Sequence, residues 1–418
     1  MNIFRINILD SIKVIFIILL FSWISFFPEP LQAKYAFFVR IFLGVFLLVL
    51  IWERRGLRQL FNFQDWPLWL FIISLSGGIF YATDKNVALA TYRNIAVAFL
   101  LLFYIGKGLV YSDKNRTAIV ISICICSGLV ALIGLMELYF GKNILYEHFI
   151  SNPFYERYVR FYPRPMSTQF MPAVLGSYLL ACLPFNFYLF RNRLLYLRWV
   201  GIFLSLLSIL VIVLTFSRGV FLGLIGLLLF YLWKTGKRRA FSMFLIVFIL
   251  VIPLASIQKD VNFNRLGFKR MILGSGDSII SEYRLRRVKM SFDMLKDYPL
   301  FGIGFNHFRI RFYEYYPKAN KDSVPYEFMI PDNMYLTFLA ETGGIGTVGF
   351  LIFIFLLLKR ALRKLETSKE DKRREMLVIA ISSLVGLLVN MGAYELFYWN
   401  SPFMLFCSIS GMIAGQKS

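Results

Sequence analysis

Long runs of apolar residues recur along almost the whole chain, separated by short polar connections. Most runs are about 17–25 residues long, the length an α-helix needs to cross a hydrocarbon layer of ~30 Å. They are continuously apolar rather than alternating, which favours helices over the strands of a membrane barrel. The pattern predicts an all-α, polytopic transmembrane bundle of about twelve spans. The predicted spans lie near residues 12–28, 35–52, 66–82, 90–110, 117–140, 171–190, 197–216, 219–233, 239–257, 333–358, 375–392 and 397–415.

Basic residues gather in every second connection, which sets the expected orientation in the membrane. Short loops rich in Lys and Arg usually stay on the cytoplasmic side. The alternation holds through all the predicted spans and places both termini in the cytoplasm. The first span is followed at once by others, so we interpret it as a retained helix rather than a signal peptide. The basic clusters lie near residues 54–58, 107–116, 191–198, 234–239 and 359–374.

Two longer segments, 141–170 and 258–331, fall on the opposite face, and both are basic. An anionic ligand is the simplest reason for this charge. Apolar residues at helical spacing predict an amphipathic helix over roughly 281–296, ended by Pro299. The chain is thus expected to divide into spans one to nine, a large and mainly helical loop, and spans ten to twelve with a basic loop near 359–374. The corresponding boundaries are 1–257, 258–331 and 332–418.

Composition narrows the class of protein further. The chain is 58% hydrophobic and 18% aromatic, which is unusual for a soluble domain. Its net charge of +22 lies mostly in short loops, where it sets topology, so no nucleic-acid partner is expected. The four cysteines fall inside apolar runs and the chain has two histidines, His148 and His307, far apart. We therefore expect no metal site and give each histidine only a minor chance of a catalytic role.

The connection Ser217-Arg218-Gly219 is so short that Arg218 must sit at or just within the membrane surface. A charge at that depth is costly and is usually functional. The alternative is an arginine that extends to lipid phosphates. Gly219 favours a tight turn, which would orient Arg218.

The helix predicted over 281–296 carries Arg284, Arg286, Arg287 and Lys289. Arg284 and Arg287 are one turn apart, on a face different from the apolar one. A guanidinium group suits phosphate oxygens because it can donate two parallel hydrogen bonds. The alternative is an ordinary solvated basic face.

A polar sequence, Pro331-Asp332-Asn333-Met-Tyr335, opens the tenth predicted span. The carboxylate of Asp332 could act as a general base at the membrane surface. The alternative is simple capping, since Asp and Asn are both favoured at a helix start. Gly343 and Gly346, one turn apart, are expected to let another helix approach closely.

The segment 141–170 contains Arg157, Arg160 and Arg164, followed by hydroxyl side chains up to Thr168. These groups could bind phosphate or sugar. An ordinary loop beside lipid headgroups explains them equally well.

Four stretches, taken in order and spacing, resemble motifs of the O-antigen ligase and polymerase superfamily, over about residues 160–360. Before that region the chain is similar to the superfamily only in hydropathy. The stretches are Arg164-Pro-Met-Ser-Thr168; Thr215-Phe-Ser217-Arg218-Gly219; Arg284 with the turn Pro299-Leu-Phe-Gly302-Ile-Gly304; and Asp332-Asn333 with Gly343-Gly-Ile-Gly346.

The resemblance implies a membrane glycosyltransferase of the bacterial inner membrane, active at the periplasmic face without a cofactor. The donor would be a glycan on undecaprenyl diphosphate, and the acceptor lipid A–core or another glycan, with inversion at the anomeric carbon. Arg218 and Arg284 would neutralise the diphosphate, and Asp332 would orient or deprotonate the acceptor. Further contacts to diphosphate and sugar are expected from Arg164, Ser217, Arg287, Asn333 and Tyr335.

One position departs from the family pattern. Ligases of this superfamily usually have His where this chain has Asp332. An aspartate has an unperturbed pKa of about 3.9 and is a weak base unless burial raises that pKa. The departure leaves open whether the chain is a ligase, a polymerase or a protein-glycosylating member.

The alternative from another class is a transporter of lipid-linked oligosaccharide. Transporters usually carry charges in mid-membrane and are built of repeated halves. Here the candidate charges lie at the outer surface, and the sequence shows no repeat.

Overall fold

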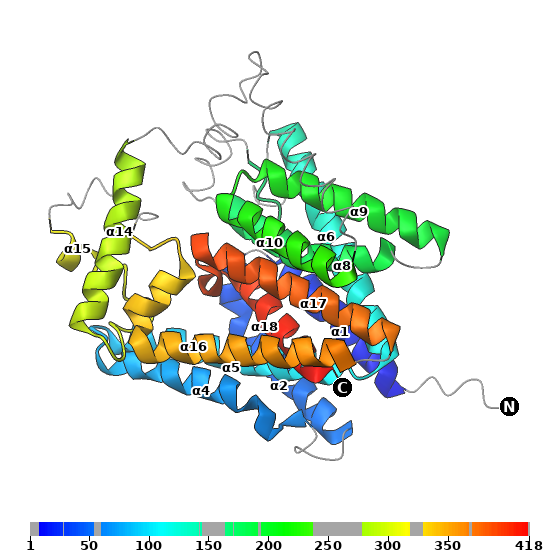
Figure 1. The fold of residues 1–418 in the computed structure, drawn as a ribbon, viewed down its shortest axis with the longest axis horizontal. Coiled ribbons are helices and arrows are strands. Elements are labelled where there is room, and N and C mark those ends of the chain that lie inside the picture. The colour runs from blue at the N-terminus through cyan, green and yellow to red at the C-terminus, as the bar shows by residue number, and fades with distance from the viewer. Residues whose placement is uncertain are drawn as a thin grey trace, which may run out of the picture.

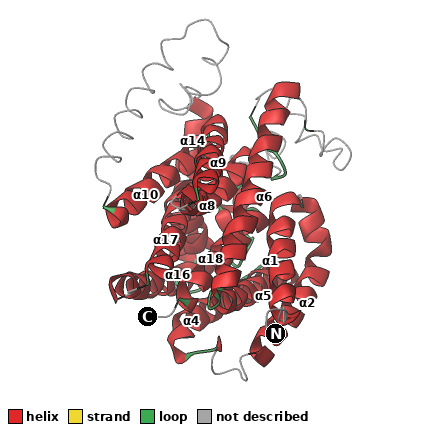
Figure 2. Ribbon diagram, turned by 90° about the vertical axis from the view of Figure 1, so that its right-hand side faces the viewer, coloured by secondary structure: helices red, strands yellow, loops and turns green. Residues whose placement is uncertain are grey.

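The computed structural model describes residues 8–27, 29–53, 60–141, 143, 164–169, 171–190, 194–236, 278–317, 329–367 and 370–416. Within these residues the chain forms helices and turns and no strand (Figure 2), which confirms the all-α prediction. The helices are α1 (Ile8–Phe26), α2 (Glu29–Glu53), η1 (Phe63–Asp65), α4 (Trp66–Leu75), η2 (Ser76–Phe80), α5 (Lys85–Leu109), α6 (Asp113–Phe140), α8 (Pro172–Phe190), α9 (Leu195–Leu214), α10 (Arg218–Thr235), α14 (Ser278–Asp297), α15 (Phe312–Tyr315), α16 (Met334–Thr367), α17 (Asp371–Asn390), η4 (Met391–Ala393), η5 (Leu396–Tyr398) and α18 (Asn400–Gly415).

Eight of the described helical segments are long and apolar enough to cross a membrane, so the chain is a polytopic membrane protein. Three further predicted spans coincide with α1, with α4 and η2 together, and with α18. The predicted span 239–257 lies outside the described residues, and the total of twelve stays a prediction. The eight segments are Lys34–Glu53, Lys85–Leu109, Asp113–Phe140, Pro172–Leu189, Leu195–Leu214, Arg218–Thr235, Met334–Thr367 and Asp371–Ala393.

The centre of the bundle is built largely from phenylalanine rings, which accounts for part of the 45 phenylalanines in the chain. Phe71 of α4 stacks on Phe353 of α16, with ring centroids 5.9 Å apart. Phe99 of α5 stacks on Phe403 of α18 at 6.0 Å. Offset and edge-on ring contacts of this kind stabilise packing beyond the area that they bury. They hold α4, α5, α16 and α18 together as one unit.

The outer surface of the bundle is also apolar. Phe37, Phe38 and Leu48 of α2 and Trp199 and Phe203 of α9 are each more than half exposed. Apolar side chains along the outside of a helix bundle are expected where lipid replaces water. By contrast, the loop helix α14 has a strongly basic sequence and stands at one end of the bundle, beside the N-terminal end of α16 (Figure 1).

Candidate functional site

The helix α14 confirms the prediction of a helix over 281–296 that ends before Pro299. The apolar face predicted for it is wrong, because Leu285 and Phe292 on that face are exposed. The buried face carries Arg287, Met290 and Met294. It packs against α16, and Arg287 lies at this contact with 1% of its side chain exposed. The Arg287 guanidinium lies 2.8 Å from Oδ2 of Asp332 and donates a hydrogen bond of 2.6 Å to the carbonyl of Ile330. Two predicted site residues, 45 positions apart in the sequence, therefore form an ion pair.

Asp332 and Asn333 have different structural roles at the start of α16. Oδ1 of Asn333 accepts hydrogen bonds from the backbone N–H groups of Tyr335 at 2.9 Å and Leu336 at 3.1 Å. Asn333 is therefore the helix cap. Asp332 has φ of 52°, a left-handed conformation that is uncommon outside glycine and recurs at functional sites. Its side chain is 42% exposed and faces Arg287.

The turn η4 joins this region to α10. Nδ2 of Asn333 donates to the carbonyl of Gly392 at 2.7 Å. Gly219 of α10 packs on the same turn, since a Cβ there would lie 2.9 Å from Cβ of Ala393 and 2.8 Å from Oδ1 of Asn390. The Ser-Arg-Gly and Asp-Asn motifs, far apart in the sequence, thus converge on one three-residue turn.

Arg218 is the first residue of α10, and its side chain is half-buried. The sharp reversal before it falls at Phe216, which has φ of 48°. The expectation that Gly219 makes this turn is wrong. Gly219 lies inside the helix and is needed because Asn390 and Ala393 leave no room for a side chain.

The Pro299–Gly304 turn docks where α16 is broken. Gly343 has φ of 64° and ψ of −165°, which interrupts the helix. The N–H groups of Gly344 and Ile345 bond to the carbonyls of Pro299 and Leu300, at 2.8 and 3.1 Å. A Cβ on Gly343 would lie 2.6 Å from the backbone of Leu300, so the approach requires glycine. The approaching segment is this turn and not the helix that the sequence led us to expect.

The other side of the same break is held by Glu341, which is buried. Its two oxygens accept backbone N–H groups of Asn306 at 2.9 Å and Phe308 at 3.0 Å, and the hydroxyl of Tyr398 donates to it as well. His307, between those residues, is fully buried. Its Nε2 accepts a hydrogen bond of 3.1 Å from the backbone N–H of Asp84. The ring proton therefore lies on Nδ1, which donates to the backbone carbonyl of Phe305. Glu341 and His307 therefore fix the loop to the membrane helices.

A second buried carboxyl, Glu395, lies just after η4 and accepts a hydrogen bond of 3.1 Å from the hydroxyl of Thr337. Burial raises the pKa of Glu395 well above its usual value, and the negative charges of Asp332 and Glu341 raise it further. Arg287 opposes this shift. Glu395 belongs to the same electrostatic cluster as the Arg287–Asp332 pair.

The remaining predicted site residues occupy three different settings. Arg284 is exposed on α14, one turn before Arg287. The hydroxyl of Tyr335 donates to the carbonyl of Leu388 at 2.7 Å, which ties α16 to α17. Arg164 is half-buried, and the residues after it are buried against α6, where Glu137 accepts the N–H groups of Met166 and Ser167 at 2.8 and 2.7 Å. Arg157, Arg160 and His148 lie outside the described residues.

Sequence reasoning missed Glu341 and Tyr398, which anchor the loop, and it also missed Glu395. A usable signal existed for Glu341, because a carboxylate inside an apolar run and next to two glycines indicates a broken helix with a polar partner. Tyr398 and Glu395 stand alone in the sequence, and only the fold brings them to α16.

Together these features define a polytopic helical membrane protein with a charged seam between the loop helix α14 and the start of α16. Residues 203–351 match the family model described as O-antigen ligase. The matched segment contains Arg218, Arg284, Arg287 and Asp332, and it confirms the resemblance to the O-antigen ligase and polymerase superfamily. No curated protein matches the chain. The match supports a function of the ligase or polymerase type in general, with membrane glycosyltransferase activity.

Proposed function

We propose that the protein is a ligase-type glycosyltransferase that moves a glycan from undecaprenyl diphosphate to lipid A–core, at the periplasmic face of the inner membrane. The observation that carries the proposal is the ion pair between buried Arg287 and half-exposed Asp332. It lies where the loop helix meets the head of α16, so the diphosphate of a lipid-linked donor and the core sugars of a lipid A–core acceptor could both reach it.

The chemistry requires one bond to form and one to break. The acceptor hydroxyl oxygen bonds to the anomeric carbon, and the bond from that carbon to the diphosphate oxygen breaks. Undecaprenyl diphosphate leaves with the electron pair, and direct displacement inverts the anomeric centre. Arg218 and Arg284 would stabilise the charge that develops on the leaving group, a task that fixed cations perform without reorganisation.

The proton of the acceptor hydroxyl would pass to Asp332. Arg287 is the positioning residue, because its side chain is almost fully buried and hydrogen-bonded to Ile330 while it holds the Asp332 carboxylate. The left-handed backbone at Asp332 turns this carboxylate away from the helix cap, which Asn333 supplies. The start of α16 therefore does not depend on the Asp332 carboxylate, which remains available to accept a proton.

Deletion of the gene in its native host, followed by gel analysis of lipopolysaccharide, tests the proposal. Loss of polymer from lipid A–core, with polymer still accumulating on the lipid carrier, supports a ligase. A single repeat unit on the core would instead make the protein a polymerase of the same superfamily. Unchanged lipopolysaccharide would exclude both O-antigen enzymes.

Purified protein separates the enzyme from a transporter. We expect transfer of sugar from an undecaprenyl-diphosphate-linked glycan to added acceptor in detergent. Movement of the lipid-linked glycan across vesicle membranes without any transfer would favour a transporter and contradict the proposal.

A further inference from the structure

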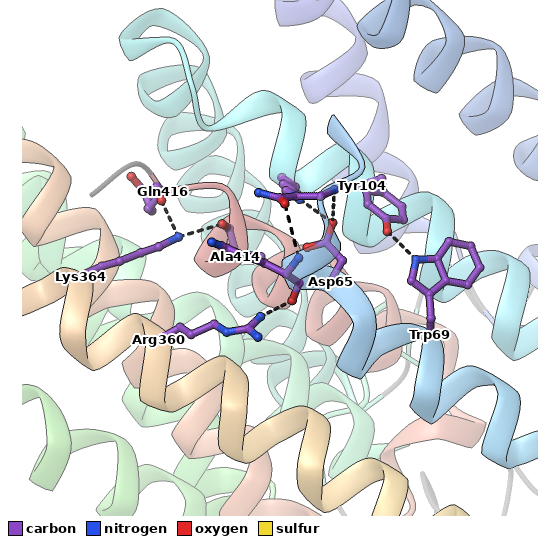
Figure 3. A network of polar contacts seen from close by, with 10 residues as sticks. Asp65, Trp69, Tyr104, Arg360, Lys364, Ala414 and Gln416 are labelled. Carbon is purple, nitrogen blue, oxygen red and sulfur yellow. Dashed lines mark hydrogen bonds and ion pairs between the residues drawn. The ribbon is translucent and has the colours of Figure 1, made fainter. Parts of the chain in front are cut away.

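A second polar cluster lies at the opposite end of α16, remote from Asp332. Lys364 lies about twenty residues beyond the break at Gly343, which is roughly 30 Å of continuous helix at 1.5 Å per residue. Here a cavity of about 280 Å³ is enclosed by the ends of α16 and α18, by α5 and by the start of α4. Figure 3 shows Arg360 and Lys364 reaching from α16 towards Asp65 and towards the end of the chain.

The cavity wall carries three cations and one carboxylate. Lys107 forms an ion pair of 2.6 Å with Asp65, and both side chains are buried. Lys364 donates to the carbonyls of Ala414 at 3.0 Å and Gln416 at 2.6 Å. Arg360 donates to a further carbonyl, that of Gln64. Carbonyl groups satisfy hydrogen bonds but do not neutralise charge. Among the described residues that line the cavity, none forms a carboxylate ion pair with Arg360 or Lys364.

The side chain of Gln416 supplies an independent observation. It is 4% exposed and lines the cavity. Within the described part of the chain, neither its amide nitrogen nor its amide oxygen has a hydrogen-bond partner. A buried amide without a partner is unfavourable, so such groups usually have one. A ligand with oxygen acceptors would provide one.

We propose that this cavity binds a phosphate group. A phosphate offers oxygens that accept hydrogen bonds from Gln416 and charge that compensates Arg360 and Lys364. The cavity has room for the group, and the predicted topology places it at the cytoplasmic surface, where membranes carry anionic lipid headgroups. The phosphate can come from such a headgroup or from a soluble phosphate. This site is separate from the proposed transfer reaction and stands independently of it.

The test measures binding to the full-length protein purified in neutral detergent. Phosphatidylglycerol in mixed micelles, inorganic phosphate alone and phosphatidylcholine serve as probes, with native mass spectrometry for retention and the Tm for stabilisation. We expect an anionic probe to be retained and to raise the Tm. The substitutions Arg360→Gln and Gln416→Leu should each weaken binding about tenfold, the usual effect of losing one contact to a charged group.

Arg363→Gln is the matched control, because it removes one positive charge from the same helix at an exposed position outside the cavity. It should bind like the unmodified protein. If Arg360→Gln and Gln416→Leu weaken the binding of phosphatidylglycerol, the phosphate belongs to a lipid headgroup. If they weaken the binding of inorganic phosphate alone, it belongs to a soluble anion. Equal binding by all four proteins, or no binding of either anionic probe, overturns the proposal.

Discussion

A cation–carboxylate pair lies beside each end of α16, and the two pairs differ in their exposure. The C-terminal end of α16 is called the inner end because the predicted topology puts it at the cytoplasmic surface. There, the side chains of Lys107 and Asp65 are 6% and 5% exposed, so neither charge is accessible. At the outer end, Arg287 is 1% exposed while Asp332 is 42% exposed. The inner pair has both charges satisfied within the protein. In the outer pair, the Asp332 carboxylate is accessible to a ligand that binds between α14 and the start of α16.

The comparison separates a structural pair from a reactive one. A fully buried pair contributes little net stability but is costly to break, because one charge is then left without a partner. A half-exposed carboxylate held by a buried arginine is fixed in position and still accessible. Disruption of the inner pair should therefore affect folding, and disruption of the outer site should affect the transfer reaction.

The largest expected effect is loss of transfer when a diphosphate-binding arginine is removed. Arg218→Ala and Arg284→Ala should each lower the transfer rate at least a hundredfold, because a fixed positive charge at the leaving group is lost. Expression should be unchanged, since Arg284 is exposed and Arg218 is only half-buried. The measurement is glycan transfer by purified variants. Lys289→Ala, an exposed cation on the same helix, is the control; normal activity in either arginine variant removes that residue from the mechanism.

Asp332→Asn tests the outer pair itself. An amide cannot accept the acceptor proton, and loss of a general base typically costs about 10²–10⁴-fold in rate. The helix cap is kept because Asn333, and not Asp332, caps α16. Some stability should be lost because the buried Arg287 loses its counter-charge, so the rate is expressed per folded molecule. The rate is compared with that of Asp293→Asn, another α14-region carboxylate, which faces Lys296 at 3.6 Å. Full activity in Asp332→Asn would mean that the outer pair is structural like the inner one.

The helical fold could be predicted, and Arg287 and Asp332 were both among the candidate residues, because apolar runs of spanning length and the order of the motifs depend on local sequence. The choice between Arg284 and Arg287 as the partner of Asp332 could not be predicted. The two residues lie one turn apart, and the rotation of α14 on α16 decides which of them is buried. The spacing of residues in the sequence shows which of them share a face of the helix, but not which face contacts another helix.

The break in α16 shows a second limit. A continuous apolar run predicts one straight helix, and Gly343 and Gly346 suggest a close helix neighbour. The positive φ at Gly343 is adopted because the Pro299–Gly304 turn supplies carbonyls for the freed N–H groups. Such a partner, about forty residues away in the sequence, follows from tertiary structure and not from local pattern.

A smaller and different effect is expected at the inner pair. Lys107→Met leaves the Asp65 carboxylate buried without a cation and should destabilise the protein by about 3–5 kcal/mol. The double variant Lys107→Met/Asp65→Leu should recover most of that loss. The measurement is thermal unfolding, and transfer per folded molecule should be unchanged. Arg373→Met, which breaks a surface pair with Glu370, is the control and should cost less than about 1 kcal/mol. Equal losses in the Lys107 and Arg373 variants would contradict the assignment of the inner pair as buried and structural.

The smallest expected effect is a pH dependence that arises from Glu395, whose described partner is a hydroxyl rather than a cation. Burial, with the nearby charges of Asp332 and Glu341, raises the pKa of Glu395 in the folded protein. Above the ordinary pKa of a glutamate, the folded state then holds a proton that the unfolded state has released. Stability must therefore fall as pH rises from that value to the folded pKa.

Glu395→Gln removes this titration while keeping an oxygen that can accept from Thr337. Between about pH 5 and about pH 8, the Tm of the unmodified protein should fall relative to that of the variant. Glu366→Gln, at an exposed position of α16, should follow the unmodified protein. If the curves for Glu395→Gln and the unmodified protein run parallel, Glu395 does not titrate in this range and burial does not hold a proton on it in the folded protein.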